Sequence, residues 1–158
     1  MRIDDVPGDV RHRLAPILEQ SFTGIYRWHA SRTLRSVDRV RAATSGNVEA
    51  GLAMFTMLEP GTGYIYYVAV LPSYRALGVG GVLLDDGLKE LRNGGAQEVF
   101  ACIRASNAPS IRLFRSRGFV KTGFRDLTRQ RGLGGAVRLW RRMVAAPGEN
   151  VYRNALRP

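Results

Sequence analysis

The chain has 158 residues, of which 45% are hydrophobic and 23% charged, as in a single globular domain. Its only cysteine, Cys102, excludes an internal disulfide and a cysteine-based metal site. No apolar run approaches the roughly 18 residues that span a bilayer, and the N-terminus does not read as a basic and then apolar leader. We therefore expect one domain over residues 1–146, a tail over residues 147–158, a cytoplasmic location and no membrane partner.

The formal net charge is +11 and arginine supplies almost all of it, because only Lys89 and Lys121 are lysines. Such a charge attracts anions, nucleic acids among them. The arginines are nevertheless scattered along the whole chain, and only 129–131 and 141–142 come close to forming clusters. We therefore expect no dedicated nucleic-acid partner, and a basic nucleic-acid-binding domain remains an alternative for the function of the chain.

In the N-terminal half, the pattern predicts a first strand, two helices and three strands. Apolar residues recur at helical spacing between Val10 and Leu18 after Asp9, a suitable N-cap. Pro16 should kink this helix or delay its start. The elements expected next are a helix over 23–34 and strands over 39–42, 48–58 and 64–70. The last of these strands is continuously apolar, which is typical of a central strand covered on both faces.

In the C-terminal half, leucines spaced four and then three apart predict a helix that ends near Gly95. The elements expected after it are a strand over 98–103, a helix that begins at Asn107 and ends near Gly118, and strands over 120–128 and 136–144 around a turn at 132–135. The order β-α-α-β-β-β-α-β-α-β-β predicts an α/β fold. Its single mixed, mostly antiparallel sheet would be flanked by about four helices.

The most informative segment is the glycine-rich turn Arg75–Gly80, which joins the apolar strand to the next helix. Glycines at a helix entrance let the backbone approach a ligand, and the unpaired N–H groups of the first helical turn favour a phosphate. A Walker loop would need Lys-Ser or Lys-Thr after its last glycine, where Gly81 and Val82 stand. A dinucleotide-binding loop would need glycine in place of Leu83. The turn therefore predicts a pyrophosphate site of another type, with an unliganded turn as the alternative.

The pattern Arg-x-x-Gly-x-Gly at Arg75–Gly80 resembles the acetyl-CoA loop of the GCN5-related N-acetyltransferases, the GNAT superfamily. A second segment, Asn107–Phe119, resembles the family pattern N-x-x-[A/S]-x-x-L-Y-x-x-x-G-F. The two motifs have the family's separation and the expected element order is the family's layout, so the resemblance covers nearly the whole chain. Within the family, the protein N-terminal and ribosomal-protein alanine acetyltransferases look most similar.

The resemblance implies acetyl-CoA as cosubstrate and no metal. Coenzyme A carries several phosphates, which accounts for part of the basic charge. The Val70 amide would contact the acetyl oxyanion. The alternative role of Arg75 is that of a solvated surface arginine. The alternative role of Asn107 is that of a helix N-cap. The implied cofactor-binding residues are Val68, Ala69, Val70, Arg75, Ala76, Leu77, Gly78, Val79, Gly80, Gly81, Asn107, Ser110 and Phe114.

Two positions depart from the family's catalytic pattern. The tyrosine that commonly protonates the leaving thiolate is replaced by Phe114, and a fifth-strand position that carries glutamate or histidine in some members is Cys102. Tyr64 is then the first candidate for a proton relay, with core packing as the alternative. Glu59 is a second candidate, with simple solvation as the alternative. A buried apolar role suits Cys102 better than an acyl-carrying one.

The family's acceptor site is walled by the first two helices and the last inter-strand loop. The implied acceptor-binding residues are Phe22, Tyr26, Trp28, Arg129 and Arg131, although aromatic residues on such a helix more often belong to the core. The two arginines would suit an acidic acceptor peptide.

Taken with the resemblance, the sequence predicts an acetyl-CoA-dependent N-acetyltransferase that acts by direct transfer in a ternary complex. The preferred acceptor is a protein or peptide N-terminal amine. Alternatives are a small-molecule amine acetyltransferase and a non-catalytic acyl-CoA-binding homologue. A monomer or a homodimer is expected.

Overall fold

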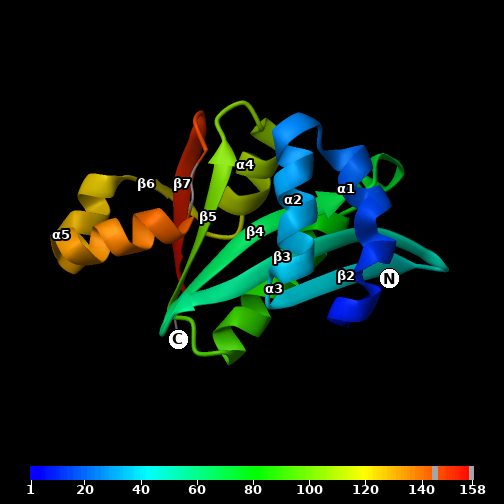
Figure 1. The fold of residues 1–158 in the computed structure, drawn as a ribbon, viewed down its shortest axis with the longest axis horizontal. Coiled ribbons are helices and arrows are strands. Elements are labelled where there is room, and N and C mark those ends of the chain that lie inside the picture. The colour runs from blue at the N-terminus through cyan, green and yellow to red at the C-terminus, as the bar shows by residue number, and fades with distance from the viewer. Residues whose placement is uncertain (144–145, 157–158) are drawn as a thin grey trace. The chain divides into compact units, whose positions relative to one another are not determined.

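The computed structural model describes residues 1–143 and 146–156 and contains one mixed sheet of seven strands with five α-helices (Figure 1). The strand order in the sheet is β1-β2-β3-β4-β5-β7-β6. The elements, in chain order, are β1 (Arg2–Asp5), η1 (Gly8–Leu14, a 3₁₀ helix), α1 (Ala15–Ser21), α2 (Gly24–Ser36), β2 (Arg39–Ser45), β3 (Val48–Glu59), β4 (Thr62–Val70), η2 (Pro72–Tyr74, a 3₁₀ helix), α3 (Val79–Asn93), β5 (Glu98–Arg104), α4 (Ala108–Arg115), β6 (Val120–Thr122), α5 (Phe124–Met143) and β7 (Glu149–Ala155).

The chain forms two compact units. Unit 1 consists of Met1–Thr56 and Ile65–Glu90, and unit 2 consists of Met57–Tyr64 and Leu91–Pro158. Strands β3 and β4 each supply residues to both units. The expectation of one domain over residues 1–146 stays a prediction. Within the described residues, no helix combines the length and apolarity needed to cross a bilayer.

Unit 1 has a core in which side chains of β3 point alternately to two faces. Leu52 and Met54 belong to the cluster that also buries apolar side chains of α1 and α2. On the other face, the strand approaches α3 so closely that a Cβ added at Gly51 would lie 3.0 Å from a Leu83 methyl carbon and 2.8 Å from the Ala69 carbonyl oxygen. This approach sets the position of α3 against β3 and β4.

Unit 2 has a core built on β5 and β7, which pair antiparallel along their full length from Glu98↔Ala155 to Arg104↔Glu149. Strand β6 pairs antiparallel with β7. Helix α5 buries Leu127, Ala136, Leu139 and Met143, and a kink at Gly132 divides it into two arms.

Most predicted elements of the first 119 residues are confirmed. Pro16 delays the first α-helix as expected, because a 3₁₀ helix precedes it and the proline lies in the first turn of α1. The predicted helix at Asn107 and the strands near 39–42, 48–58, 64–70 and 98–103 are also present.

The predicted last two strands are wrong beyond Thr122. The strand expected over 120–128 ends after three residues, and the segment expected as the strand 136–144 is part of α5, apart from residue 144, which lies outside the described residues. The last strand is β7, inside the segment expected to be a tail, whose residues 157 and 158 also lie outside the described part. After the kink, the buried residues Ala136, Leu139 and Met143 follow helical rather than strand spacing.

Candidate functional site

The loop between β4 and α3 places two left-handed residues directly before a helix. Ala76 has φ 62° and Gly78 has φ 83°, and α3 begins at Val79. The N–H of Val82 bonds to the Gly78 carbonyl at 3.1 Å and closes the first helical turn. Turns with left-handed residues form concave sets of N–H groups that bind anions, and the positive end of the helix dipole adds to them. This loop conformation is compatible with the phosphate site predicted for residues 75–81.

Ala76 is the one non-glycine residue with positive φ among the residues described. A left-handed conformation costs an L-residue with a Cβ roughly 1–2 kcal/mol. Strain of this kind persists where function requires it. Ala76 is exposed, so burial does not force the conformation.

Arg75 ties the loop to the end of β4. Its Nε donates to the carbonyl oxygen of Val70 at 3.2 Å, and no carboxylate in the described part of the chain pairs with it. The Ser21 hydroxyl also donates to the Val70 oxygen, at 3.4 Å. Of the predicted cofactor-binding residues on β4, Val68 and Val70 are half-buried and Ala69 is buried.

The predicted acceptor residues of unit 1 lie at the end of α1 and on α2. The Phe22 ring meets Tyr67 of β4 edge-on, with centroids 5.2 Å apart. Tyr26 is half-buried, whereas Trp28 is 58% exposed and lies under the Arg32 guanidinium, 5.7 Å from ring centroid to Cζ.

A contact between α2 and β4 was missed by the sequence analysis. His29 Nδ1 lies 2.7 Å from the Tyr67 hydroxyl oxygen. The two residues are 38 positions apart and belong to no shared motif, so no signal in the sequence could have paired them. The contact fixes α2 to β4 beside Phe22.

In unit 2, the cofactor-binding residues predicted at α4 make contacts that stabilise this helix and its packing. The Asn107 side-chain oxygen accepts a hydrogen bond from the Ser110 N–H at 3.2 Å, which confirms the N-cap role. Phe114 is 4% exposed and packs edge-on against Phe119 at a centroid distance of 4.9 Å. The phenylalanine ring offers no proton donor.

In unit 2, Tyr64 and Cys102 both contact the same backbone carbonyl group. The Tyr64 hydroxyl donates to the carbonyl oxygen of Met143 at 3.0 Å, and the Cys102 sulfur lies 4.0 Å from the same oxygen. Burial raises the pKa of the Cys102 thiol to about 11. The charge of Glu149 also raises this pKa, whereas a hydrogen bond with Tyr64 lowers it. The thiol is therefore protonated at neutral pH, as suits a packing residue rather than a nucleophile.

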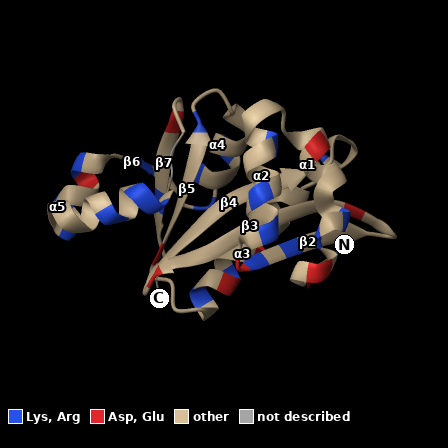
Figure 2. Cartoon of the chain, viewed as in Figure 1, with Lys and Arg blue, Asp and Glu red and all other residues tan. Residues whose placement is uncertain are grey.

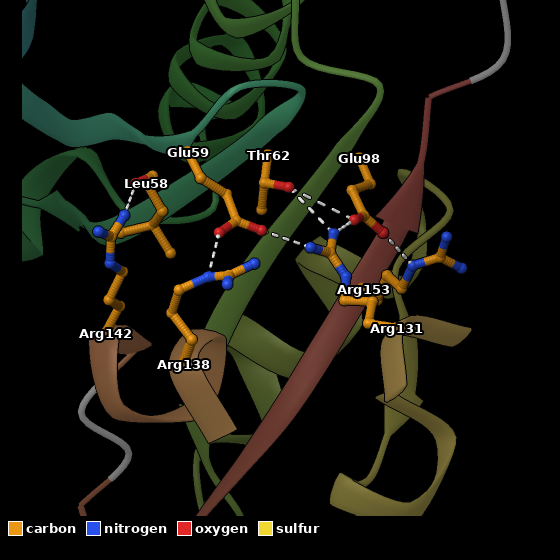
Figure 3. A network of polar contacts seen from close by, with 8 residues as sticks. All are labelled: Leu58, Glu59, Thr62, Glu98, Arg131, Arg138, Arg142 and Arg153. Carbon is orange, nitrogen blue, oxygen red and sulfur yellow. Dashed lines mark hydrogen bonds and ion pairs between the residues drawn. The ribbon is translucent and has the colours of Figure 1, made fainter. Parts of the chain in front are cut away.

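The other proton-relay candidate, Glu59, belongs to a network of ion pairs in unit 2 (Figure 3). Its side chain is 14% exposed and pairs with Arg131 and, at 3.2 Å, with Arg138. Arg131 also pairs with Glu98, which in turn pairs with Arg153 at 2.5 Å. Both carboxylate oxygens of Glu59 are therefore engaged by arginine side chains.

The two arginines predicted to bind an acceptor differ in their surroundings. Arg131 is 20% exposed and engaged by both carboxylates of the network, and it also donates to the Thr62 hydroxyl at 3.0 Å. The Arg129 side chain is 81% exposed, with Asp126 3.8 Å away. Of the two, Arg129 has the side chain that is open to a ligand.

No group of three or more metal-ligating side chains occurs among residues 1–143 and 146–156.

Comparison with known proteins gives a consistent family match. The model of the acetyltransferase (GNAT) family matches residues 14–119. An N-alpha-acetyltransferase of Sulfurisphaera tokodaii is 40% identical over 58 residues, 36% of this chain and 35% of that protein. A mycothiol acetyltransferase of Thermomonospora curvata is 42% identical over 59 residues, 37% of this chain and 20% of that protein. The matches thus span about a third or less of the length of these curated relatives.

Solved structures share the fold over almost the whole chain. The ribosomal-protein-alanine N-acetyltransferase of Brucella melitensis has a TM-score of 0.66 and 20% identity, with 99% of this chain and 100% of that chain covered. A Bacillus subtilis acetyltransferase in complex with CoA has a TM-score of 0.73 and 17% identity, with 99% of both chains covered. At these identities the likeness establishes the fold.

Proposed function

The chain belongs to the GNAT acetyltransferase family, and from this we propose that it transfers the acetyl group of acetyl-CoA to a primary amine. The preferred acceptor is the N-terminal amino group of a protein or peptide, by direct transfer in a ternary complex. The location proposed for this activity is the cytoplasm.

The observation that carries the proposal is the backbone of the loop before α3. Left-handed Ala76 and Gly78 precede the first turn of a 15-residue helix, in an exposed loop tied to β4 through Arg75. A CoA pyrophosphate is an anion that such a set of N–H groups and a helix N-terminus would hold. We assign the pyrophosphate to residues 75–81 and the acetyl oxyanion to the amide of Val70. The contacts assigned to Val68, Ala69, Asn107, Ser110 and Phe114 stay predictions.

The choice of acceptor is supported by the contacts of the two proton-relay candidates. Both carboxylate oxygens of Glu59 are engaged by arginines, and the Tyr64 hydroxyl donates a hydrogen bond to a backbone carbonyl. Deprotonating a lysine amine at pH 7 costs roughly 4.6 kcal/mol, against about 1–1.4 kcal/mol for an α-amino group. An N-terminal amine is therefore the acceptor that best tolerates this site. Unchanged turnover in Tyr64→Phe across the pH range would remove Tyr64 from the mechanism.

Relatives also support a second candidate acceptor. Several matched proteins are mycothiol acetyltransferases, so a small-molecule amine is the alternative to a peptide. Phe114, which replaces the usual proton-donating tyrosine, keeps the third alternative open, a homologue that binds acyl-CoA without transfer.

Paired glycine variants test the loop. Gly78→Ala and Gly46→Ala both place a Cβ where nothing lies within 4 Å, at φ +83° and +60°, so both bear a similar conformational cost. Acetyl-CoA at about 100 times its dissociation constant should add about 2.7 kcal/mol of stability and several degrees to the melting temperature.

We expect the parent chain and Gly46→Ala to show this shift and Gly78→Ala to lose most of it. An equal shift in all three proteins would contradict the assignment of the pyrophosphate to this loop. No shift in any of them would contradict acetyl-CoA binding.

A further inference from the structure

The basic charge that looks scattered along the sequence is concentrated in one of the two units. Unit 1 contains ten Lys or Arg residues and nine Asp or Glu residues, whereas unit 2 contains fourteen and four. The formal charges are therefore +1 and +10. The proposed pyrophosphate loop belongs to the nearly neutral unit, so the cosubstrate leaves most of the positive charge of unit 2 unexplained.

The four carboxylates of unit 2 all have internal partners. Glu59 and Glu98 are each bound by two arginines of the network in Figure 3. Asp126 accepts from the Gly123 N–H at 3.0 Å, and Glu149 accepts from the Ala146 N–H at 2.8 Å. The four carboxylates already have partners within the unit, and its basic residues outnumber them by ten.

Helix α5 holds the densest part of this charge (Figure 2). It has one acidic residue, Asp126, and six arginines, of which all but Arg131 are exposed. We define the α5 arginine surface as these five exposed residues: Arg125, Arg129, Arg138, Arg141 and Arg142. Because Arg138 and Arg142 also reach Glu59 and the Leu58 carbonyl, the other three have the guanidinium groups that are most available.

We propose that the α5 arginine surface binds the sugar–phosphate backbone of a nucleic acid, contrary to the expectation from the sequence. Arginine presents a planar fork that matches a phosphate in a bidentate manner, and the five arginines are distributed over both arms of the kinked helix. A nucleic acid carries many phosphates along its backbone, so one molecule can supply a partner to several arginines at once.

An apolar protein interface fits the surface less well. The large apolar residues exposed on α5 are Leu133 and Val137, 63% and 40% exposed, and a protein interface normally has a larger apolar centre.

The proposed contacts of the arginines with nucleic acid go to phosphates. Binding should therefore be independent of base sequence and similar for RNA and DNA.

Two triple variants with the same change in net charge test the proposal. Arg125, Arg129 and Arg141 are replaced by glutamine in one full-length protein, and Arg27, Arg32 and Arg35 of α2, which are also exposed, in the other. Fluorescence anisotropy follows the binding of labelled single-stranded RNA and DNA of about 20 nucleotides between roughly 0.05 and 0.2 M salt.

We expect the α5 triple to bind either strand at least about tenfold more weakly and to lose about 2 from the slope of log K against log salt. The α2 triple should change affinity less than about twofold, and acetyl-CoA should raise the melting temperature of both variants equally. Equal weakening by both triples, a marked preference for RNA or DNA, or equally tight binding of polyglutamate would each overturn the proposal. The acetyl-CoA measurement separates this outcome from a failure of the proposed activity.

Discussion

Each unit contains an arginine side chain with little solvent exposure, and the two units satisfy its hydrogen-bond donors in different ways. In unit 1, Arg11 is 8% exposed and donates to the backbone carbonyls of Val6, Leu34, Val37 and Asp38, at 2.6 to 3.2 Å. In unit 2, Arg131 is held by the carboxylates of Glu59 and Glu98. Unit 1 therefore uses an arginine side chain to satisfy backbone carbonyl groups, whereas unit 2 uses its few acidic side chains to pair with partly buried arginines.

This difference has a consequence for function. Unit 1 keeps almost no net charge and presents a strained loop whose N–H groups suit a phosphate. Unit 2 uses its carboxylates internally and exposes the arginines of α5. In the two proposals, anion binding would depend on backbone geometry in unit 1 and on side-chain charge in unit 2.

The largest effect is expected from Arg11→Met. The substitution keeps much of the apolar volume but removes the donor from four carbonyl groups, of which those of Val6, Leu34 and Val37 belong to buried residues. Each buried carbonyl without a partner costs about 1–3 kcal/mol. We expect a loss of about 3–5 kcal/mol in the free energy of unfolding, measured by urea denaturation. The control is Arg13→Met, whose side chain is 49% exposed and ion-paired with Glu49, and which should cost less than about 1 kcal/mol. Similar losses in both would show that the carbonyl contacts contribute little.

A smaller loss is expected from Glu98→Gln in unit 2. The amide keeps the shape of the carboxylate but removes the charge that faces Arg131 and Arg153, and breaking a mostly buried pair costs about 2–4 kcal/mol. Glu90→Gln, which removes the more exposed pair with Arg39, should cost less than about 1 kcal/mol. Urea denaturation measures the loss in the free energy of unfolding of each variant. Equal costs would mean that the network is no stronger than a surface pair.

The smallest effect concerns the reactivity of Cys102. A thiol with pKa about 11 is roughly 0.1% thiolate at pH 8, against roughly a quarter for an ordinary cysteine, and its higher basicity recovers about tenfold in nucleophilicity. Iodoacetamide should therefore alkylate the folded chain at least about tenfold more slowly than the unfolded chain. Because burial raises the pKa, the rate should keep rising with pH up to about 11. A plateau near the ordinary cysteine pKa would contradict this.

Local motifs predicted the parts of the site that depend on a few consecutive residues. The turn before α3 and the Asn107 cap are set by glycine, asparagine and proline at fixed offsets, so the sequence was sufficient to place both. Pro16 likewise marked the start of α1 within its first turn.

Two kinds of feature could not be predicted. Glu59 and Arg131 are 72 positions apart and meet only through tertiary structure, as do His29 and Tyr67. Helix α5 was mistaken for a strand because the glycines at 132–135 resemble a hairpin turn, although Ala136, Leu139 and Met143 follow helical spacing. The concentration of charge in unit 2 is visible in the linear sequence once its C-terminal part is counted separately, because residues 91–158 contain all fourteen Lys and Arg residues of the unit and three of its four acidic residues.

The central claim is acetyl transfer from acetyl-CoA to an N-terminal amine. It is tested most directly by incubating the full-length protein with isotope-labelled acetyl-CoA and a library of peptides with free and blocked N-termini, followed by mass spectrometry. We predict that one labelled acetyl group appears on the α-amino group of a subset of free peptides, with none on blocked ones, and that Gly78→Ala reduces it far more than Gly46→Ala does. Label only on lysine side chains, or no label on any peptide, would contradict the account.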